Sequence, residues 1–504
     1  MSTDDRVQWF PLSQAQRSRW FQYCLDPAGR GRHNNIFTLR LHGEFNEVCW
    51  HAALLTVVRR HPMLRARFSD ESGEPLQCFG KSARVCWQVV DARGLNQVQL
   101  EQAVAGEAVK PLDLSAEGSP LRVTVFKCET TTVLLLALDH LVSDGWSYWM
   151  LVSEWGAEVT GAKEVKASTL NYADYVSRQK KWLEGTEAQS QLAYWQDALQ
   201  GSLPVLRLHF AERAQALAPN PQVLSLTLPR SLVQGLSISS GKSRNSLFVS
   251  LLLAYKLALW RFTGQSDLII GCPMPARGDG EWDAVCGDFV NVIPLRSFFD
   301  GKERLNEVMR AVRRTALRGM TAQDYPFALM VERLGLSRGV HHPVFQVMFA
   351  FQKARHDGGL HKLWQIDGSC GPELAWGGVK ASAFPFAQGM GAHGLEMTLQ
   401  TLEIDGEVRC DFCFDAGRHE LVGIKRLADA FVSFLTLMID GDDQAPLDEL
   451  SVLREGEREQ VLFGFNATQA EYPQQALIQE LFEAQVKRSP QATALVYEEQ
   501  SLSY

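Results

Sequence analysis

The stretch LLLALDHLVSDGWSYWM, residues 134–150, joins an uninterrupted apolar run to an abrupt polar ending. Apolar runs without alternation are typical of strands that are buried on both faces. Here the run ends in Asp139 and His140, and Asp144 and Gly145 follow within five residues. A strand that serves only the core does not need a histidine and two carboxylates at its end. We therefore interpret this strand end as a candidate site.

The composition places the chain among globular proteins with more than one folding unit. Its 504 residues exceed what one hydrophobic core usually holds, and 46% of them are apolar. The net charge of −8, without long runs of either sign, argues against a nucleic-acid substrate. The first ten residues lack a signal-peptide layout, and the apolar segment 246–262 is interrupted by Lys256 and Arg261. The sequence predicts a cytoplasmic location and no membrane partner.

Helical and strand patterns alternate along the first 440 residues. Helices are predicted at 12–25, 46–61, 145–159, 245–262, 303–318, 326–335 and 418–439, and strands at 35–43, 64–68, 121–128, 131–139, 267–272, 344–352, 395–403 and 407–414. This mixture predicts two lobes, each a sheet with helices packed on it.

The composition and periodicity of the sequence change after residue 440. The following stretch is polar, is interrupted by Pro and Gly, and has no sustained period, so we predict a linker there. A helix, a turn and a strand restart near residue 476, and the chain stops within this pattern. We interpret this ending as the start of another domain, and the chain as one piece of a longer protein.

The ten cysteines have no regular spacing. Only Cys410 and Cys413 form a C-x-x-C, and they lie in the alternating stretch EVRCDFCFD, 407–415. Positions three apart on a strand face opposite sides. We therefore expect buried thiols in a reducing compartment rather than a zinc or dithiol site.

The chemistry available at the strand end depends on His140. A strand that leads through a short loop into a helix is where ligands bind in open α/β sheets. A histidine there titrates near neutral pH and can accept or donate a proton. Asp144 lies inside the tight loop that we expect Gly145 to permit.

Structural roles for the same residues stay open at this point. His140 can be a packing residue, Asp139 a solvated strand end, and Asp144 or Ser147 the N-cap of the following helix. A metal site of Asp139, His140 and Asp144 lacks further ligands at metal-site spacing. The sequence has no G-x-S-x-G elbow that would indicate a serine hydrolase.

The stretch DHLVSDGWS (139–147) resembles the HHxxxDG signature of condensation domains of nonribosomal peptide synthetases, which belong to the chloramphenicol-acetyltransferase-like acyltransferases. Other stretches resemble the remaining motifs of the family in the same order, and the resemblance covers residues 10–450. These stretches are LSQAQRSRW (12–20), RRHPMLRARF (59–68), NYADY (171–175), IGCPMPAR (270–277), GDFVNVIPLR (287–296), AQDYPFALMVERL (322–334) and HHPVFQVMFAFQ (341–352).

This resemblance implies an α/β fold of two chloramphenicol-acetyltransferase-like lobes, each a mixed sheet with helices, that form a V with a central tunnel. We predict an N-terminal lobe at 1–180 and a C-terminal lobe at 181–450. The tail resembles the linker to an adenylation domain at 451–475 and the start of that domain at 476–504.

The resemblance also assigns roles at the site. In this family two carrier proteins feed phosphopantetheine arms into the tunnel, and the acceptor amine attacks the donor thioester. His140 corresponds to the histidine that faces the reacting centre, and the N–H of Gly145 can approach the oxyanion. Asp144 is expected to pair with Arg277 of the IGxPxxxR motif, which would pin the loop to the second lobe.

Other residues near the signature are expected to support the site. Trp146 is predicted to belong to the core, and Ser147 to cap the helix or touch a pantetheine arm. A substrate tunnel is predicted to be lined by Ser147, Tyr148, Trp149, Asn291 and Gln346.

No cofactor or metal is expected to be bound directly. The predicted substrates are the phosphopantetheine arms of partner carrier proteins, or acyl-CoA. The expected partners are donor and acceptor carrier proteins, an acyl or peptidyl thioester donor, and an adenylation domain downstream in the same chain.

Asp139 is the visible departure from the family pattern, because it replaces the first histidine of the signature. That position usually supports the fold, so we expect condensation chemistry to survive. Asp139 and Asp144 also reproduce the D-x-x-x-x-D signature of heterocyclisation domains, which is the main alternative. Such domains usually lack the histidine kept as His140. A non-catalytic scaffold that only recruits partners is another alternative, which the loss of His140 or Gly145 would have favoured; both residues are present. An epimerisation domain normally precedes another condensation domain, which the tail contradicts.

The predicted donor is an acyl group rather than an aminoacyl group. The first family motif begins about ten residues after Met1, so the donor is expected to arrive from another polypeptide or as a free thioester. This predicts a chain-initiating, N-acylating domain, or one that accepts a polyketide or peptidyl chain. The rings of Tyr148 and Trp149 are candidates to limit the donor tunnel, with packing as the alternative.

Overall fold

The computed structural model describes two compact units, Met1–Ser451 and Val452–Tyr504, which we treat separately. The described residues are 8–27, 29–71, 73–115, 118–161, 167–213, 215, 220–243, 246–278, 280–336, 342–353, 359–363, 371–384, 395–441, 443–453, 455–472 and 474–504.

The first half of the larger unit is built on a six-stranded sheet, in which only β5 and β6 pair in parallel. Its order is β12 (Leu374–Trp376), β13 (Val379–Ala383), β2 (Asn34–His42), β7 (Thr131–Asp139), β6 (Leu121–Lys127) and β5 (Cys86–Asp91). A smaller sheet contains β1 (Trp9–Pro11), β4 (Leu76–Phe79) and β3 (Ala66–Ser69). The helices of this half are α1 (Gln14–Leu25), α2 (Glu47–Arg60), α3 (Gln97–Ala108) and α4 (Gly145–Thr160).

Strand β7 is buried on both faces, as its uninterrupted apolar run predicted. Leu134, Leu136 and Leu138 join the core cluster that contains residues of α2 and α4. The alternate residues, among them Leu135 and Ala137, join a second cluster that contains residues of α3. Because helices cover both faces, the strand cannot alternate apolar and polar residues, and only its end is available for chemistry.

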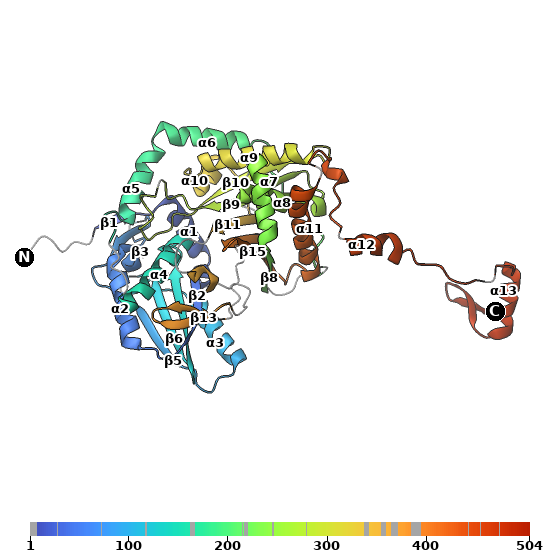
Figure 1. The fold of residues 1–504 in the computed structure, drawn as a ribbon, viewed down its shortest axis with the longest axis horizontal. Coiled ribbons are helices and arrows are strands. Elements are labelled where there is room, and N and C mark those ends of the chain that lie inside the picture. The colour runs from blue at the N-terminus through green and yellow to red at the C-terminus, as the bar shows by residue number, and fades with distance from the viewer. Residues whose placement is uncertain are drawn as a thin grey trace, which may run out of the picture. The chain divides into compact units, whose positions relative to one another are not determined.

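The second half is built on another mixed six-stranded sheet (Figure 1). Strands β9, β11 and β14 are parallel neighbours, and the other pairs are antiparallel. The order is β10 (Asn291–Phe298), β9 (Asp267–Met274), β11 (Val347–Lys353), β14 (Met397–Ile404), β15 (Glu407–Asp415) and β8 (Pro221–Leu228).

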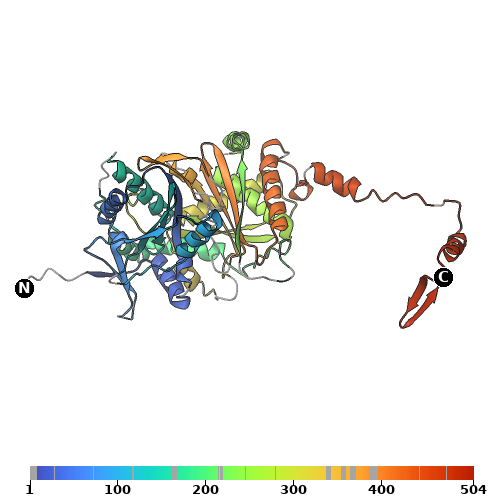
Figure 2. The same ribbon diagram turned by 90° about the horizontal axis from the view of Figure 1, so that it is seen from below.

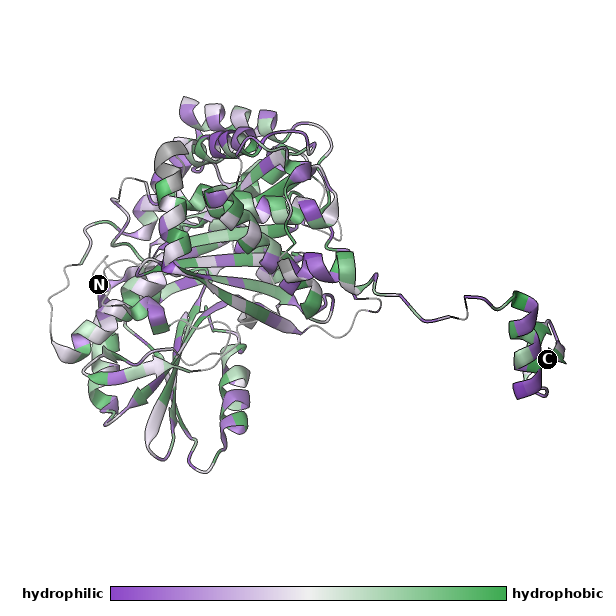
Figure 3. Cartoon of the chain, turned by 45° about the vertical axis from the view of Figure 1, so that its right-hand side comes forward, coloured by the Kyte–Doolittle hydropathy of each residue, from purple (hydrophilic) through white to green (hydrophobic). Residues whose placement is uncertain are grey.

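Seven helices are described in this half and in the segment that leads to it. They are α5 (Tyr172–Leu183), α6 (Thr186–Ala198), α7 (Arg230–Ser243), α8 (Leu247–Thr263), α9 (Leu305–Thr321), α10 (Phe327–Arg333) and α11 (Leu421–Asp440). Helices α7, α8 and α11 lie together beside the sheet (Figure 1). Figure 2 shows from below that the blue and cyan elements of the first half adjoin the green to orange elements of the second. The hydropathy colouring shows helices that alternate hydrophobic and hydrophilic residues along their length (Figure 3).

These sheets and helices confirm the predicted mixed α/β class. Strand β10 was not predicted, and it contains Pro294. Proline is tolerated there because β10 lies at the edge of its sheet. The hairpin β12–β13 extends the first sheet by pairing β13 with β2, although its residues fall within the range 181–450 predicted for the second lobe. The range predicted for the second lobe therefore contributes one hairpin to the sheet of the first lobe. The lobe boundaries stay predictions.

The unit Val452–Tyr504 contains helix α12 (Glu455–Glu459) and a π-helical turn, Gln460–Gly464, within the range 451–475 where the sequence predicts a linker. The later helix is α13 (Ile478–Arg488), followed by a hairpin of β16 (Thr493–Tyr497) and β17 (Gln500–Ser503). Several of its apolar side chains are exposed, among them Ile478, Val496 and Tyr497.

Two further expectations can be compared with the described residues. Cys410 and Cys413 both lie in β15 as free, buried thiols, as the alternating pattern predicted. None of the helices in the described ranges is long and apolar enough to cross a membrane.

Candidate active site

The turn that follows β7 is organised by Asp139. Its side-chain oxygen Oδ1 accepts hydrogen bonds from the Tyr23 hydroxyl and from the N–H of Leu141, both at 2.9 Å. Its carbonyl accepts bonds from the N–H of Val142 and the hydroxyl of Ser143. The carboxylate is buried, and burial raises its pKa. Asp139 is thus a structural residue of the turn, and the hypothesis of a solvated strand end is wrong.

The expected ion pair between Asp144 and Arg277 is present and buried. Nη2 of Arg277 lies 2.9 Å and 3.0 Å from the two carboxylate oxygens of Asp144, and both side chains are almost fully excluded from solvent. Arg277 also donates from Nη1 to the carbonyls of Trp282 and Val285 and lies 4.0 Å from the ring centroid of Phe289. The contacts with Asp144 hold the loop of the signature against the second half of the unit, and the other contacts fix the Arg277 side chain within that half.

Asp144 also begins helix α4. Its Oδ1 accepts a hydrogen bond from the N–H of Ser147 at 2.7 Å, the N-cap geometry that the sequence predicted. The hydroxyl of Ser147 is occupied as well: it donates to the carbonyl of Gly287 and accepts from Gly287 N–H and Arg277 Nη2. This pattern places Ser147 in the lobe contact rather than in a tunnel wall.

Gly145 is not required for the backbone conformation of the loop. It is the first residue of α4, its φ lies outside the positive range, and a Cβ built on it would meet no atom within 4 Å. The idea that Gly145 permits a tight loop is therefore wrong. Its effect is to leave open space at an exposed helix N-terminus, where N–H groups point outward.

The aromatic residues that open α4 are packing residues in this structure. Tyr148 and Trp149 are buried, with rings 5.8 Å and 5.6 Å from the ring of Phe37. Trp146, which was predicted to belong to the core, is only half-buried and lies outside the core clusters; it donates from Nε1 to the carbonyl of Asp283. The guanidinium of Arg277 lies 5.4 Å from its ring centroid.

His140 lies between the turn and the second half of the unit, with 25% of its side chain exposed. Burial, followed by the positive charge of Arg19, lowers the pKa of His140 to about 3. The imidazole is therefore neutral at physiological pH. Its Nδ1 lies 3.7 Å from Oδ1 of Asp288.

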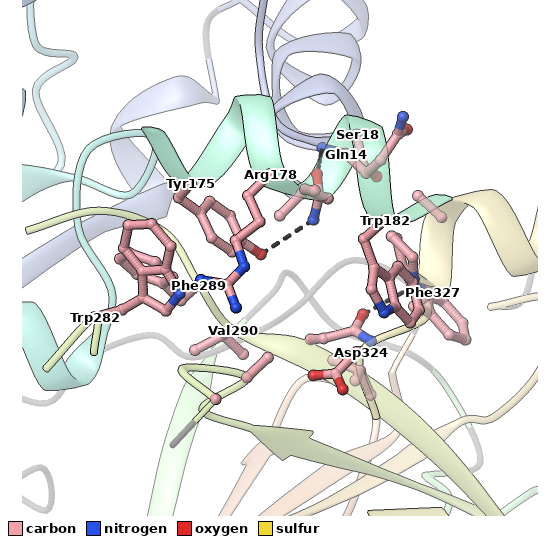
Figure 4. Close-up of a pocket in the computed structure, with 18 of the residues that line it drawn as sticks. Gln14, Ser18, Tyr175, Arg178, Trp182, Trp282, Phe289, Val290, Asp324 and Phe327 are labelled. Carbon is pink, nitrogen blue, oxygen red and sulfur yellow. Dashed lines mark hydrogen bonds between the residues drawn. The ribbon is translucent and has the colours of Figure 1, made fainter. Parts of the chain in front are cut away.

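A pocket of about 570 Å³ (Figure 4) has Arg19 in its wall, whereas His140 is not among the residues that line it. Its volume falls in the range of small-molecule sites. Helices α1, α5 and α10 and the start of β10 contribute its walls, which include Arg19, Tyr175, Trp182, Asn291, Asp324 and Phe327. Of the predicted tunnel residues, only Asn291 lines this pocket. Its side-chain Nδ2 donates hydrogen bonds to the backbone carbonyls of Gln323 and Tyr325. Gln346 lies elsewhere, bonded to the backbone of Leu206 and His342.

Two residues near His140, Arg19 and Asp288, were not predicted from the sequence. Both lie in quoted motifs, but they are 269 positions apart, and no local pattern joins them. Within the described ranges, no group of three or more His, Cys, Asp or Glu side chains is arranged to hold a metal ion.

The chain has a two-lobed fold of the chloramphenicol-acetyltransferase type. Each lobe contains one of the two mixed sheets, and the Asp144–Arg277 ion pair joins the loop after His140 to the second lobe. The family model described as "Condensation domain" matches residues 7–462, so the chain belongs to the condensation-domain family. Members of this family are acyltransferases that form amide bonds.

Among curated proteins, a linear gramicidin synthase from Brevibacillus parabrevis is 29% identical over 99% of this chain, which spans 10% of that relative. A solved four-domain nonribosomal peptide synthetase bound to AMP and glycine matches all of this chain and 38% of its own, with a TM-score of 0.81 and 18% identity. The starter condensation domain of rhizomide synthetase in complex with C8-CoA has a TM-score of 0.69 and 19% identity, covering 88% of this chain and 98% of its own.

Proposed function

We propose that this chain forms an amide bond between an acyl thioester donor and the amine of an aminoacyl thioester held on an acceptor carrier protein. The observation that carries the proposal is His140: a neutral imidazole at the end of a buried strand, on a loop held by the buried Asp144–Arg277 pair. Family membership supports the same reaction class.

The step balances without a cofactor. The amine nitrogen attacks the thioester carbonyl carbon, a C–N bond forms, and the C–S bond breaks. The proton lost by nitrogen ends on the departing thiolate, and the acyl group ends on the acceptor. The phosphopantetheine arms of the carrier proteins, or coenzyme A on the donor side, carry both substrates.

We infer that His140 orients the amine rather than removing its proton completely. An imidazole whose pKa lies near 3 accepts a proton poorly from an α-ammonium group, whose usual pKa is about 8. A neutral imidazole nitrogen can still accept a hydrogen bond from an attacking amine. Positioning of two bound reactants alone supplies large rate factors.

Heterocyclisation is not favoured by the geometry of the two aspartates. Asp139 accepts bonds from Tyr23 and Leu141, and Asp144 accepts bonds from Arg277 and Ser147. Both carboxylates thus accept hydrogen bonds from other residues of the chain and have structural roles. We keep amide formation as the proposal.

The proposed organisation follows the sequence boundaries. Residues 1–180 and 181–450 form the two lobes, with β12–β13 as the hairpin contributed to the first sheet, around a central tunnel that admits the substrates. Residues 451–475 form the linker, and 476–504 begin an adenylation domain that loads the acceptor. Donor and acceptor carrier proteins are the partners.

For the donor we propose an acyl group, free of an α-amine. Its support is the similarity in fold to the rhizomide starter domain, which holds C8-CoA. The expected result is that acyl-CoA or an acyl carrier protein acylates an aminoacyl acceptor carrier, while an aminoacyl carrier donor does not. Intact mass of the acceptor carrier after a single turnover checks this. Amide formation from the aminoacyl donor alone contradicts the acyl assignment and leaves condensation itself standing.

A further inference from the structure

Two buried polar atoms face each other beside the site. Nδ1 of His140 and Oδ1 of Asp288 are both shielded from solvent, and neither has a hydrogen-bond partner in the described part of the chain. They lie 3.7 Å apart, slightly beyond hydrogen-bond distance. Buried polar atoms are nearly always satisfied, so an unsatisfied pair in a site calls for an explanation.

Asp288 is held in place from the other side. Its Oδ2 lies 3.1 Å from both Nε and Nη2 of Arg19, and its side chain is fully buried. The hydroxyl of Tyr172 donates to its backbone carbonyl. Arg19 comes from α1 and Asp288 from the segment before β10, so the pair joins the two halves of the unit. The Arg19 contacts use one carboxylate oxygen and leave the other directed toward His140.

We propose that Asp288 is a positioning residue for His140, which keeps the imidazole proton on Nδ1 and so leaves Nε2 as the acceptor for the attacking amine. The geometry requires only a small closure for Nδ1–H to donate to Oδ1. The catalytic part of this inference rests on the proposed function, whereas the tautomer does not.

The tautomer decides what His140 can do. A neutral imidazole has one N–H donor and one acceptor, and the group facing one nitrogen determines the role of the other. A proton on Nε2 would present a donor to the amine and remove the lone pair that orients it. A carboxylate can only accept, so Asp288 favours the proton on Nδ1.

Other groups around the ring act on its charge as well. Arg19 of α1 and His33 disfavour a charged imidazole, whereas Asp144 at the start of α4 and the backbone carbonyl of His140 itself favour it. The backbone carbonyl acts in the same sense as Asp288, because it too only accepts. The contact of Asp288 Oδ2 with the guanidinium of Arg19 favours the ionised carboxylate and opposes the effect of burial, which raises the pKa of Asp288.

The test uses the full chain carrying 15N-labelled histidine, in which the ring signals of His140 are assigned from His140→Ala. In the native protein we expect the Nδ1–H tautomer to predominate. In Asp288→Asn the carboxamide can donate to Nδ1, so the Nε2–H tautomer should become a major form. The single-turnover rate of amide formation should fall about tenfold or more at saturating substrates.

Asp267→Asn is the matched control, because Asp267 forms a comparable two-point ion pair with Arg296 on neighbouring strands. It should lower the melting temperature without changing the tautomer or the rate. Should Asp288→Asn fail to fold, Asp288→Ser is measured in the same way, with loss of Nδ1–H preference expected.

An unchanged tautomer in the Asp288 variant overturns the proposal even if the rate falls, since the pair would then only clamp the lobes. A shifted tautomer in Asp288→Asn, together with a native protein that forms no amide, supports positioning by Asp288 and contradicts the proposed function instead.

Discussion

Replacing His140 with alanine is expected to slow single-turnover amide formation by about 100-fold or more, the lower end of what a positioned proton-transfer or hydrogen-bonding group contributes. The fold should persist, because the side chain is a quarter exposed and its Nδ1 has no hydrogen-bond partner in the described residues. The measurement is rapid-quench formation of the acylated acceptor carrier, with circular dichroism to confirm folding.

His42→Ala serves as the matched control for that experiment. His42 ends the neighbouring strand β2, where it pairs with Thr131 at the opposite end of β7, and its exposure of 32% is similar. Its bond to Ser382 is structural. A rate that stays near the native value in His140→Ala, or falls equally in His42→Ala, would remove His140 from the reaction.

Asp144→Ala is expected to destabilise the protein by about 3–5 kcal/mol, because it leaves the guanidinium of Arg277 buried without its charge partner. It also removes the N-cap of α4, which supports the loop of His140. A strong fall in melting temperature and in soluble yield should therefore accompany any loss of rate.

A double variant separates the effect of the unpaired charge on stability from the effect of the lost side-chain packing. Combining Asp144→Ala with Arg277→Leu removes the unpaired charge, so the double variant should be more stable than the sum of the two single changes implies. Asp91→Asn, in the exposed pair with Arg93, should leave the melting temperature almost unchanged. Additive effects of Asp144→Ala and Arg277→Leu, or an unchanged melting temperature for Asp144→Ala, would contradict the account of this pair.

The predicted elements are correct where the hydrophobic periodicity of the sequence agrees with burial in the structure. The apolar run ending at Asp139 is a strand covered on both faces, and Asp144 caps the helix that follows. The motif resemblance placed Arg277 opposite Asp144, which no local pattern could have done. Chain-wide resemblance thus supplied contacts that depend on tertiary structure.

Features that depend on long-range contacts were missed or misassigned. The hairpin β12–β13 lies in the second half of the sequence but completes the first sheet, and its strands are only three and five residues long. Gly145 was assigned a conformational role, whereas its backbone is ordinary and the space beside it is open. Arg19 and Asp288 each look like ordinary charged residues until folding brings them together beside His140.

Amide formation by this chain is tested most directly by the mass of the acceptor carrier protein after one turnover. The full chain is mixed with an aminoacyl acceptor carrier and an acyl thioester donor, and the product is then treated with mild alkali, which cleaves thioesters but leaves amides. The carrier is expected to gain the mass of the acyl group, and alkali is expected to release an N-acyl amino acid. Release of the unmodified amino acid, from a folded chain with both substrates loaded, would contradict amide formation by this chain.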